Sequence, residues 1–303
     1  MVKSQRKQWR LVIQLQSPMQ IGTGSLGMVE KTDMYIPGRV LWGALTATLV
    51  RQNITRSKPE DYIKVGEALG PHEIFFSSFF PSFDKGDSEW LPVFEGNKRS
   101  WVKCCCKTGK FNFQKKRSEE EMQSMLISGQ SGNATDPKRM ATFDKSLHET
   151  DILSPLIKNG KSFSPVYFTG IMQLPHNLTV SEEITINIDK DIFEPIFSHC
   201  RLGGGRKRGW GIVRLVSLKS KSSLDESLSV RNYSGGNLLI TSPTHFVKDN
   251  VTALNGRAFL ATYRQYCNKK GQGRGFTSSQ LCWEAGTLIP RLVFDYGQKV
   301  PTF

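Results

Sequence analysis

The sequence predicts an α+β fold with a βαββαβ chain order, and three observations predict it. Residues 9–16 alternate apolar and polar positions, which is typical of a strand with one buried face. Residues 38–52 instead repeat apolar side chains at helical spacing. A second strand–helix–strand series occupies residues 164–218, beyond a long polar stretch. The chain therefore contains the same kind of unit twice, with an insertion between the two halves.

The first predicted strand, at 9–16, places Leu11, Ile13 and Leu15 on its inward face. The segment that follows, IGTGSLGMVEKTDM, carries three glycines and is predicted to be a loop. We expect this glycine loop to border the sheet.

The helix predicted at 38–52 begins next to Pro37, whose missing N–H costs nothing in a first turn. Residues 74–80, IFFSSFF, are predicted to form a buried strand that Pro81 ends. These elements complete the first strand–helix–strand unit.

The stretch 84–150 is predicted to be irregular and polar, apart from a short helix at 118–127. The second unit is predicted to consist of strands at 164–174, 182–188 and 210–218 and a helix at 190–200. Without the insertion, the order is the ferredoxin-like pattern that RNA-recognition domains also use.

Two parts of the chain are predicted. Residues 1–218 form the ferredoxin-like domain, with an insertion at about 84–160. Residues 219–303 form a smaller α/β C-terminal extension or a second small domain. In that part we expect a linker at 219–228, strands at 237–242 and 287–296, and a helix at 253–268.

The bulk composition favours an anionic partner. The chain of 303 residues has a net charge of +14, which makes nucleic acid the simplest candidate. Neither a signal peptide nor a membrane-length apolar run is visible. The spacing of the six cysteines suits neither a disulfide framework nor a zinc site, so we expect a reduced, cytoplasmic protein without metal or cofactor.

The densest positive charge lies within a run of glycines, at LGGGRKRGWG. Glycine allows positive φ angles and close approach of the backbone to a ligand, while exposed N–H groups and cations can hold phosphates. A tryptophan face can stack a base. The predicted RNA-binding residues of this loop are Gly203, Gly204, Gly205, Arg206, Lys207, Arg208, Gly209 and Trp210. The alternative is a solvated turn with Trp210 in the core.

A second basic region runs from Lys98 to Arg117 and contains eight Lys or Arg residues and no acidic residue. Trp101, Phe111 and Phe113 are interleaved with these charges. Such a region can bind an RNA backbone and stack its bases. A solvated charged loop is the alternative.

Two segments resemble the CRISPR-associated RAMP superfamily. YIPGRVLWGALTATLVR resembles the pattern that introduces the first helix in that family, and LGGGRKRGWGIVRL resembles its glycine-rich loop. The matching residues are Tyr35, Ile36, Pro37, Gly38, Leu41, Gly43, Ala44, Leu45, Gly203–Gly205, Arg206, Arg208, Gly209 and Gly211. Weaker similarities, at FFSSFFPSF and from Arg139 to Leu174, extend the resemblance over residues 9–218.

The pattern is most similar to the Cas-five-like subgroup of type III systems. This resemblance implies a non-catalytic subunit that binds the repeat-derived 5′ tag of the guide RNA and caps the effector complex. It implies RAMP backbone subunits and the large signalling subunit as partners, indirect contact with target RNA, and no membrane. The further RNA-binding residues that we expect are Gly22, Gly24, Tyr35, Pro37, Gly38, Arg39, Lys103, Lys107 and Arg139.

Asp33 is the strongest catalytic candidate, because some backbone subunits of type III complexes use a loop Asp to cleave target RNA. An acidic residue close to a helix N-terminus is also explained by the helix dipole. The five histidines are scattered, and none lies in either glycine loop. A binding module is therefore preferred. A cleaving backbone subunit that uses Asp33 and a guide-processing endoribonuclease remain as alternatives.

Overall fold

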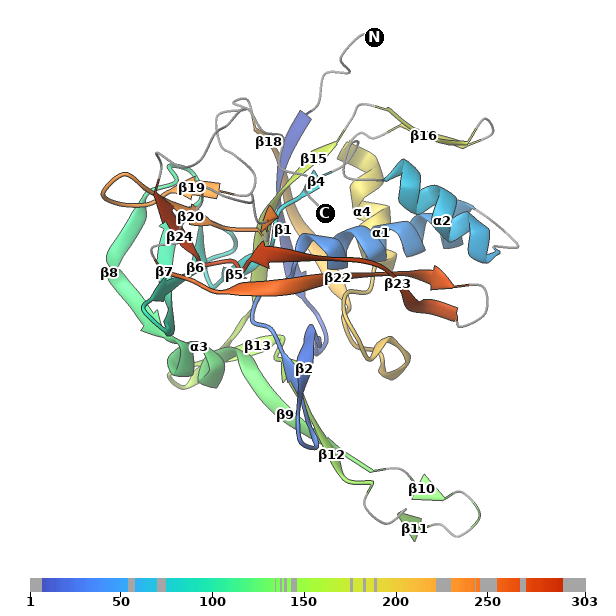
Figure 1. Cartoon of the computed structure of the whole chain (residues 1–303), viewed down its shortest axis with the longest axis horizontal. Helices are drawn as coiled ribbons and strands as arrows, with labels where there is room; N and C mark the ends of the chain where they lie inside the picture. Colours follow the sequence, from blue (N-terminus) through green and yellow to red (C-terminus); the bar gives the residue numbers. More distant parts are fainter. Residues whose placement is uncertain are drawn as a thin grey trace.

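The computed structural model shows a mixed α/β protein (Figure 1). It describes residues 7–53, 58–69, 75–133, 135–136, 138, 141–142, 146–174, 177–181, 184–187, 190–221, 230–242, 244–245, 255–267 and 271–290. Within these ranges, no helix is long and apolar enough to cross a membrane. Arg139, one of the expected RNA-binding residues, lies outside them.

An antiparallel sheet lies at the centre of the molecule. Its strands are β1 (Lys7–Leu15), β4 (Phe75–Phe76), β5 (Phe80–Ser82), β15 (Tyr167–Leu174) and β18 (Val213–Lys221). The order across the sheet is β18–β1–β15–β4, and β5 also pairs with β15. Leu11, Ile13 and Leu15 are buried, so the predicted inward face of β1 is confirmed, and Val12 on its other face is buried as well.

Helices cover this sheet. They are α1 (Gly38–Asn53), α2 (Pro59–Ala68) and α4 (Lys190–His199). Leu41 and Leu45 of α1 and Phe193 of α4 meet Phe76 and Met172 of the sheet. This packing explains the helical spacing of apolar residues in both helices, and the helices predicted at 38–52 and 190–200 are confirmed.

The strand predicted at 74–80 is wrong in detail, because two short strands, β4 and β5, replace it. Pro81 does not end a strand but lies inside β5, opposite Phe168. Since β5 pairs only with β15, it lies at a sheet edge. A proline is tolerated there because its missing N–H faces away from the ladder.

The second unit also differs at its ends. The strand predicted at 164–174 is divided between β14 (Ser162–Pro165) and β15. The strand predicted at 182–188 is the short strand β17 (Ile184–Asn187). The strand predicted at 210–218 begins at Val213 and continues through Lys221, into the predicted linker. These shifts leave the order of the main elements unchanged.

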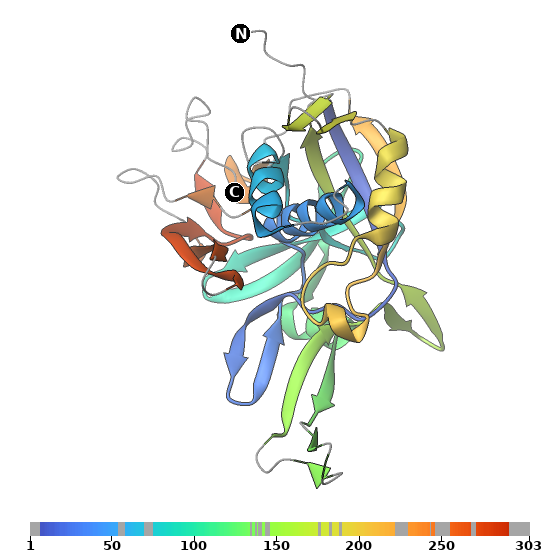
Figure 2. The same cartoon turned by 90° about the vertical axis from the view of Figure 1, so that its right-hand side faces the viewer.

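The first glycine segment is a hairpin rather than the predicted loop. It forms β2 (Gly22–Leu26) and β3 (Val29–Thr32). Strand β3 pairs in parallel with β12, and β12 pairs with β9. This sheet, which we call the arm, projects from the body of the molecule (Figures 1 and 2). Its other strands are β9 (Ile127–Gly132) and β12 (His148–Leu153), and nearby hairpins are β10 (Thr135–Asp136) with β11 (Ala141–Thr142) and β13 (Leu156–Asn159) with β14 (Ser162–Pro165).

The prediction of an irregular segment at 84–150 is wrong. Its first part forms a three-stranded antiparallel sheet of β6 (Ser88–Glu95), β7 (Lys98–Cys105) and β8 (Phe111–Ser118). Helix α3 (Glu119–Leu126) follows and confirms the predicted short helix. A capping box begins it, in which Ser118 Oγ accepts a hydrogen bond from the Glu121 N–H at 3.2 Å and Glu121 Oε2 accepts one from the Ser118 N–H at 2.8 Å.

The described C-terminal residues form strands. They are β19 (Val230–Asn232), β20 (Asn237–Ile240), β21 (Thr244–His245), β22 (Ala258–Cys267), β23 (Gly271–Trp283) and β24 (Leu288–Pro290). Earlier in the chain, β16 (Asn177–Ser181) and β17 (Ile184–Asn187) make a separate hairpin. The helix predicted at 253–268 is wrong, because β22 pairs along its length with β23. Leu239, Ala285 and Leu288 belong to the same apolar core as the central sheet.

Two glycines of α1 test how closely this helix approaches the sheet. A methyl group added at Gly38 would lie 2.2 Å from the carbonyl oxygen of Phe76, whereas one added at Gly43 would meet no atom within 4 Å. We expect Gly38→Ala to lower the free energy of unfolding by roughly 1–3 kcal/mol, because the backbone of β4 must move. Gly43→Ala should raise it by about 0.5–1 kcal/mol through helix propensity. Thermal unfolding of both variants measures this, and shifts of the same sign would contradict the packing.

Candidate nucleic-acid interface

The basic glycine loop folds as one turn of 3-10 helix. Arg206–Arg208 form the turn, flanked by Gly205 at φ 67° and Gly209 at φ 81°. The Arg208 N–H donates to the Gly205 carbonyl at 2.8 Å. Both flanking residues adopt left-handed backbone conformations, which explains why glycine stands at each end.

The loop is docked on the chain that leads into the β2–β3 hairpin. The Gly204 N–H donates to the Gln20 carbonyl at 2.8 Å, and the Gly211 N–H donates to the Pro18 carbonyl at 2.7 Å. A methyl group at Gly203 would lie 2.2 Å from the Gln20 carbonyl oxygen. The basic loop therefore packs on residues 18–20, immediately before the first glycine segment. Figure 2 shows the orange turn beside the blue base of the hairpin.

The close approach that these glycines allow is to the protein's own chain. At Gly211, whose φ is 77°, an added methyl group would lie 1.9 Å from the carbonyl oxygen of Leu202. The N–H groups of Gly204 and Gly211 are engaged internally. The expected backbone cradle for phosphate therefore does not include these two N–H groups. The loop presents side-chain cations instead.

Arg206, Lys207 and Arg208 are all exposed. Arg206 Nε donates to the Gly203 carbonyl at 3.1 Å, and the Arg208 guanidinium lies 5.1 Å from the ring centroid of Trp210. These contacts restrict where the two arginines can point. Two restricted arginines lose less conformational entropy when they bind phosphates than mobile side chains would.

Trp210 cannot serve as the expected base-stacking surface. Its side chain is only 5% exposed, and Arg208 lies over its ring. The alternative from the sequence, a tryptophan in the core beneath a basic turn, is the one that the structure supports. Trp210 instead positions Arg208 through a cation–π contact.

The residues at the start of α1 are divided between core and surface. Tyr35, Pro37 and Gly38 are buried, and Tyr35 stacks on Phe80 with ring centroids 5.4 Å apart. The side chains of Tyr35 and Pro37 and the backbone of Gly38 therefore belong to the core rather than to an RNA surface, contrary to expectation. Arg39 is exposed, as are Gly22 and Gly24 of β2.

Half of the eight cations in the second basic region pair with carboxylates of the protein, namely Arg99, Lys103, Lys107 and Lys116. Lys103 Nζ lies 3.0 Å from Asp84 Oδ2, and Lys116 pairs with Glu95. Lys107 lies 3.7 Å from Asp87, but both side chains are more than two-thirds exposed, so this pair contributes little stability. Trp101 is completely buried and cannot stack a base. Trp101 is therefore excluded as a stacking surface, whereas the expected RNA contacts of Lys103 and Lys107 stay predictions.

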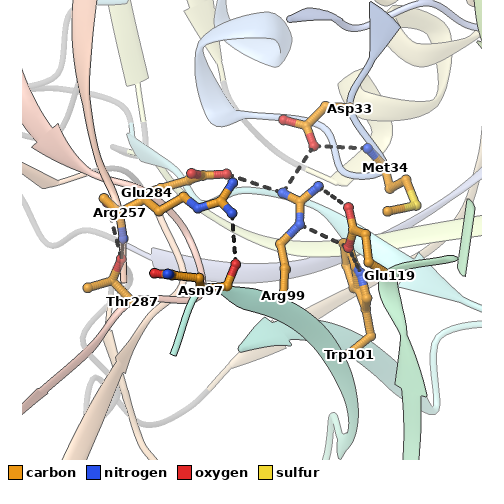
Figure 3. Close-up of polar contacts among 9 residues, drawn as sticks. All are labelled: Asp33, Met34, Asn97, Arg99, Trp101, Glu119, Arg257, Glu284 and Thr287. Atoms are coloured by element: carbon orange, nitrogen blue, oxygen red, sulfur yellow. Dashed lines mark hydrogen bonds and ion pairs between the residues drawn. The ribbon is translucent and has the colours of Figure 1, made fainter. Parts of the chain in front are cut away.

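Asp33 points into the protein, toward β7 (Figure 3). Its side chain is 11% exposed. Asp33 Oδ1 accepts a hydrogen bond from the Met34 N–H at 3.0 Å and lies 3.9 Å from Arg99 Nη1. Arg99 also contacts Glu119 and, at 3.2 Å, Glu284. We call these four charged side chains the Arg99 cluster.

In the Arg99 cluster a single guanidinium, that of Arg99, contacts three carboxylates. Burial raises the pKa of Asp33 to about 7 despite the attraction of Arg99, and burial also raises the pKa of Glu284. Trp101 Nε1 donates to Glu119 Oε2 at 2.7 Å, which holds the third carboxylate in place. Asp33 therefore joins the β3–α1 junction to β7.

Sequence reasoning missed the Arg99 cluster because its members are distant in the chain and no spacing links them. Arg201 was missed as well, although its position just before the glycine run is a signal. It is exposed, and its Nη1 donates to the Arg206 carbonyl at 3.1 Å. Among the described residues, no group of three His, Cys, Asp or Glu side chains is arranged to hold a metal ion.

No protein-family model and no curated protein matches this sequence. Solved structures do share the fold. A chain in the cryo-EM structure of the Type III-B Cmr-β bound to cognate target RNA and AMPPnP is 10% identical, with 94% of this chain and 86% of that chain covered and a TM-score of 0.55. A chain of Cmr-β bound to cognate target RNA is 11% identical, with 94% and 87% covered and a TM-score of 0.51.

The raised pKa of Asp33 should make the free energy of unfolding depend on pH. Between the ordinary pKa of 3.8 and about 7, folded Asp33 holds a proton that the unfolded chain has released. The contribution of Asp33 to the free energy of unfolding therefore falls as the pH rises through this window. Because an amide cannot titrate, Asp33→Asn should gain stability relative to wild type between about pH 4 and about pH 8, by at most about 4 kcal/mol.

Urea unfolding at several pH values measures this difference. Asp87→Asn is the matched control, because the Asp87 side chain is 72% exposed. A constant difference between Asp33→Asn and wild type across the pH range would contradict a buried, protonated Asp33.

Proposed function

We propose that this chain is a non-catalytic subunit of a type III CRISPR effector complex that binds the 5′ tag of the guide RNA and caps one end of the complex. The observation that carries this proposal is the exposed turn Arg206–Arg208, held against the base of the β2–β3 hairpin. A rigid positive turn at the edge of a sheet suits an RNA backbone.

The arrangement of the central sheet supports a ferredoxin-like assignment. If β4 and β5 count as one strand, the first strand lies between the fourth and the third, and the second lies at the edge. Helices α1 and α4 follow the first and third of these strands, which matches the βαββαβ order. The similar fold of chains in Type III-B Cmr-β structures, which are described as bound to target RNA, is consistent with this role.

The resemblance of the sequence to the RAMP superfamily guides the choice of partners. In this proposal the chain contacts RAMP backbone subunits and the large signalling subunit, and it meets target RNA only indirectly. Residues 230–290 act as an extension of the RNA-binding body rather than as a separate domain. Their shared core residue Leu239 and the contact of Glu284 with Arg99 support that choice.

Catalysis at Asp33 is disfavoured by its surroundings. A residue that cleaves RNA must reach the attacking oxygen, the leaving oxygen or a metal ion. Asp33 Oδ1 instead accepts from Met34 and faces Arg99 in the interior. The cleaving backbone subunit and the guide-processing endoribonuclease therefore receive less support than the cap.

Replacement of Arg206, Lys207 and Arg208 with Ala should weaken binding of guide RNA. If all three meet phosphates, the slope of log K against log salt should flatten by roughly two to three units. Fluorescence anisotropy of a labelled guide RNA over a salt series measures the slope. The matched control replaces Lys58, Lys64 and Lys158, which are exposed on other elements. Equal slopes for the two triple variants would mean that the turn does not meet phosphate.

Asp33→Asn should leave every target cleavage position intact in the reconstituted complex. The amide keeps an oxygen that can accept from the Met34 N–H, so the junction survives while any acid–base role is removed. Sequencing of the cleavage products measures this, and native mass spectrometry should find a single copy of the chain per complex. Loss of one cleavage position, or several copies of the chain, would favour a cleaving backbone subunit.

A further inference from the structure

A basic pocket lies on the sheet of β6, β7 and β8. Its volume is about 360 Å³, which is within the range of small-ligand sites. Four cations line it, namely Lys103, Lys115, Lys116 and Arg117, together with the single carboxylate of Asp84. The turn at Arg206–Arg208 does not contribute to it.

Both oxygens of the Asp84 carboxylate are bonded within the protein. Asp84 therefore does not compete with an anionic ligand for the other cations of the pocket. Its Oδ1 accepts from Ser82 Oγ at 3.0 Å and from the Ser88 N–H at 2.9 Å, and its Oδ2 pairs with Lys103. These bonds lower the pKa of Asp84, although burial opposes them. Lys103 uses one donor for this pair and retains two for a ligand.

Arg117 is held at the pocket by aromatic rings rather than by a carboxylate. Its guanidinium lies 4.6 Å from the ring centroid of Trp90 and 5.5 Å from that of Phe83, and it contacts Met125. Among the described residues no carboxylate forms an ion pair with Arg117, and Glu121 attracts it only from a greater distance. Burial lowers the pKa of Arg117, so an anion would compensate a partly desolvated cation. A planar guanidinium matches phosphate geometry well.

A bulge in β8 carries both an aromatic residue, Phe113, and one of these cations, Lys115. Asn112 pairs with Lys103 and Lys116 pairs with Val102, so the three residues between them, including Phe113 and Lys115, have no partner on β7. Phe113 is 51% exposed.

Phe113 belongs to an aromatic group formed by β8 and the residue that follows β19. It stacks on Phe111 at 6.0 Å and meets Tyr233 edge-on at 5.2 Å. Cations interleaved with an exposed aromatic group are typical of surfaces that bind single-stranded nucleic acid.

We propose that this pocket binds a phosphate of a single-stranded RNA segment, with a neighbouring base stacked on Phe113. Lys103, Lys115 and Arg117 hold the phosphate. The choice of RNA as the ligand rests on the proposed function, but the site goes beyond it. It is a second RNA contact, on elements other than the turn Arg206–Arg208, which we call the tag-binding turn. Lys116, which pairs with Glu95, contributes less.

The test uses the full chain and a labelled uridine pentamer in the background in which Arg206, Lys207 and Arg208 are Ala. Any remaining binding then does not depend on the tag-binding turn. Lys115→Ala should weaken binding of the pentamer by about threefold to tenfold and flatten the salt slope by about one unit. Phe113→Ala should weaken it by about fivefold or more. Both side chains are exposed, so neither variant threatens folding.

Matched controls separate the pocket from general charge and exposure. Lys98→Ala removes an exposed cation at the other end of β7, and Phe163→Ala removes an aromatic side chain that is 68% exposed on β14. Both should leave pentamer binding unchanged. Arg117→Lys should weaken binding while circular dichroism shows an intact fold, because lysine lacks the planar fork.

Competition experiments distinguish RNA from inorganic phosphate and from an acidic protein segment as the ligand of this pocket. Unlabelled pentamer should displace the label at much lower concentration than inorganic phosphate or an acidic peptide. Displacement by phosphate alone, with no effect of Phe113→Ala, would mean that the pocket holds a small anion and would overturn the RNA assignment. Equal displacement by the peptide would indicate a protein partner and overturn it too. Wild-type affinity in both Lys115→Ala and Phe113→Ala would overturn the site while leaving the tag-binding turn untouched.

Discussion

One guanidinium, that of Arg99, connects three parts of the chain that are far apart in sequence. It contacts Asp33 before α1, Glu119 at the start of α3 and Glu284 after β23, and all four side chains are less than a quarter exposed. Removing the cation would leave three carboxylates close together in a partly desolvated site, which is strongly unfavourable. The position of the β6–β8 sheet relative to α1 and the C-terminal strands therefore depends on this residue.

A second charged group also connects distant parts of the chain, but in it one carboxylate lies between two cations. Glu89 of β6 is completely buried, 2.7 Å from Arg231 of β19 and 3.7 Å from Arg10 of β1. The Glu89 group joins the central sheet, the insertion and the C-terminal strands, whereas the Arg99 cluster joins the chain before α1, the insertion and the C-terminal residues. The cations engaged in this way are not available to RNA. A net charge of +14 thus overstates the binding surface, and the useful charge is the part that remains exposed, such as Lys207 and Lys115.

Local patterns predicted some elements well and others wrongly, for identifiable reasons. Apolar spacing predicts strand β1 and helix α1, although Val12 of β1 and the whole run 44–50 of α1 are buried as well. Residues 258–267 contain apolar side chains at spacings that suit a helix, but pairing with β23 makes them a strand. The β6–β8 sheet escaped notice because its edge strand β8 is almost entirely polar and exposed, so that no alternation marks it.

The sequence by itself determined the basic charge, the positions of the glycines and the periodic elements, because these depend on composition and on neighbours along the chain. Only the tertiary structure decided which of the marked residues face outward. Trp210 is buried beneath Arg208, and Asp33 turns toward Arg99, although both stand beside glycine or charge in the sequence. Burial and ion pairing depend on residues brought together from distant segments, and no local spacing records those contacts.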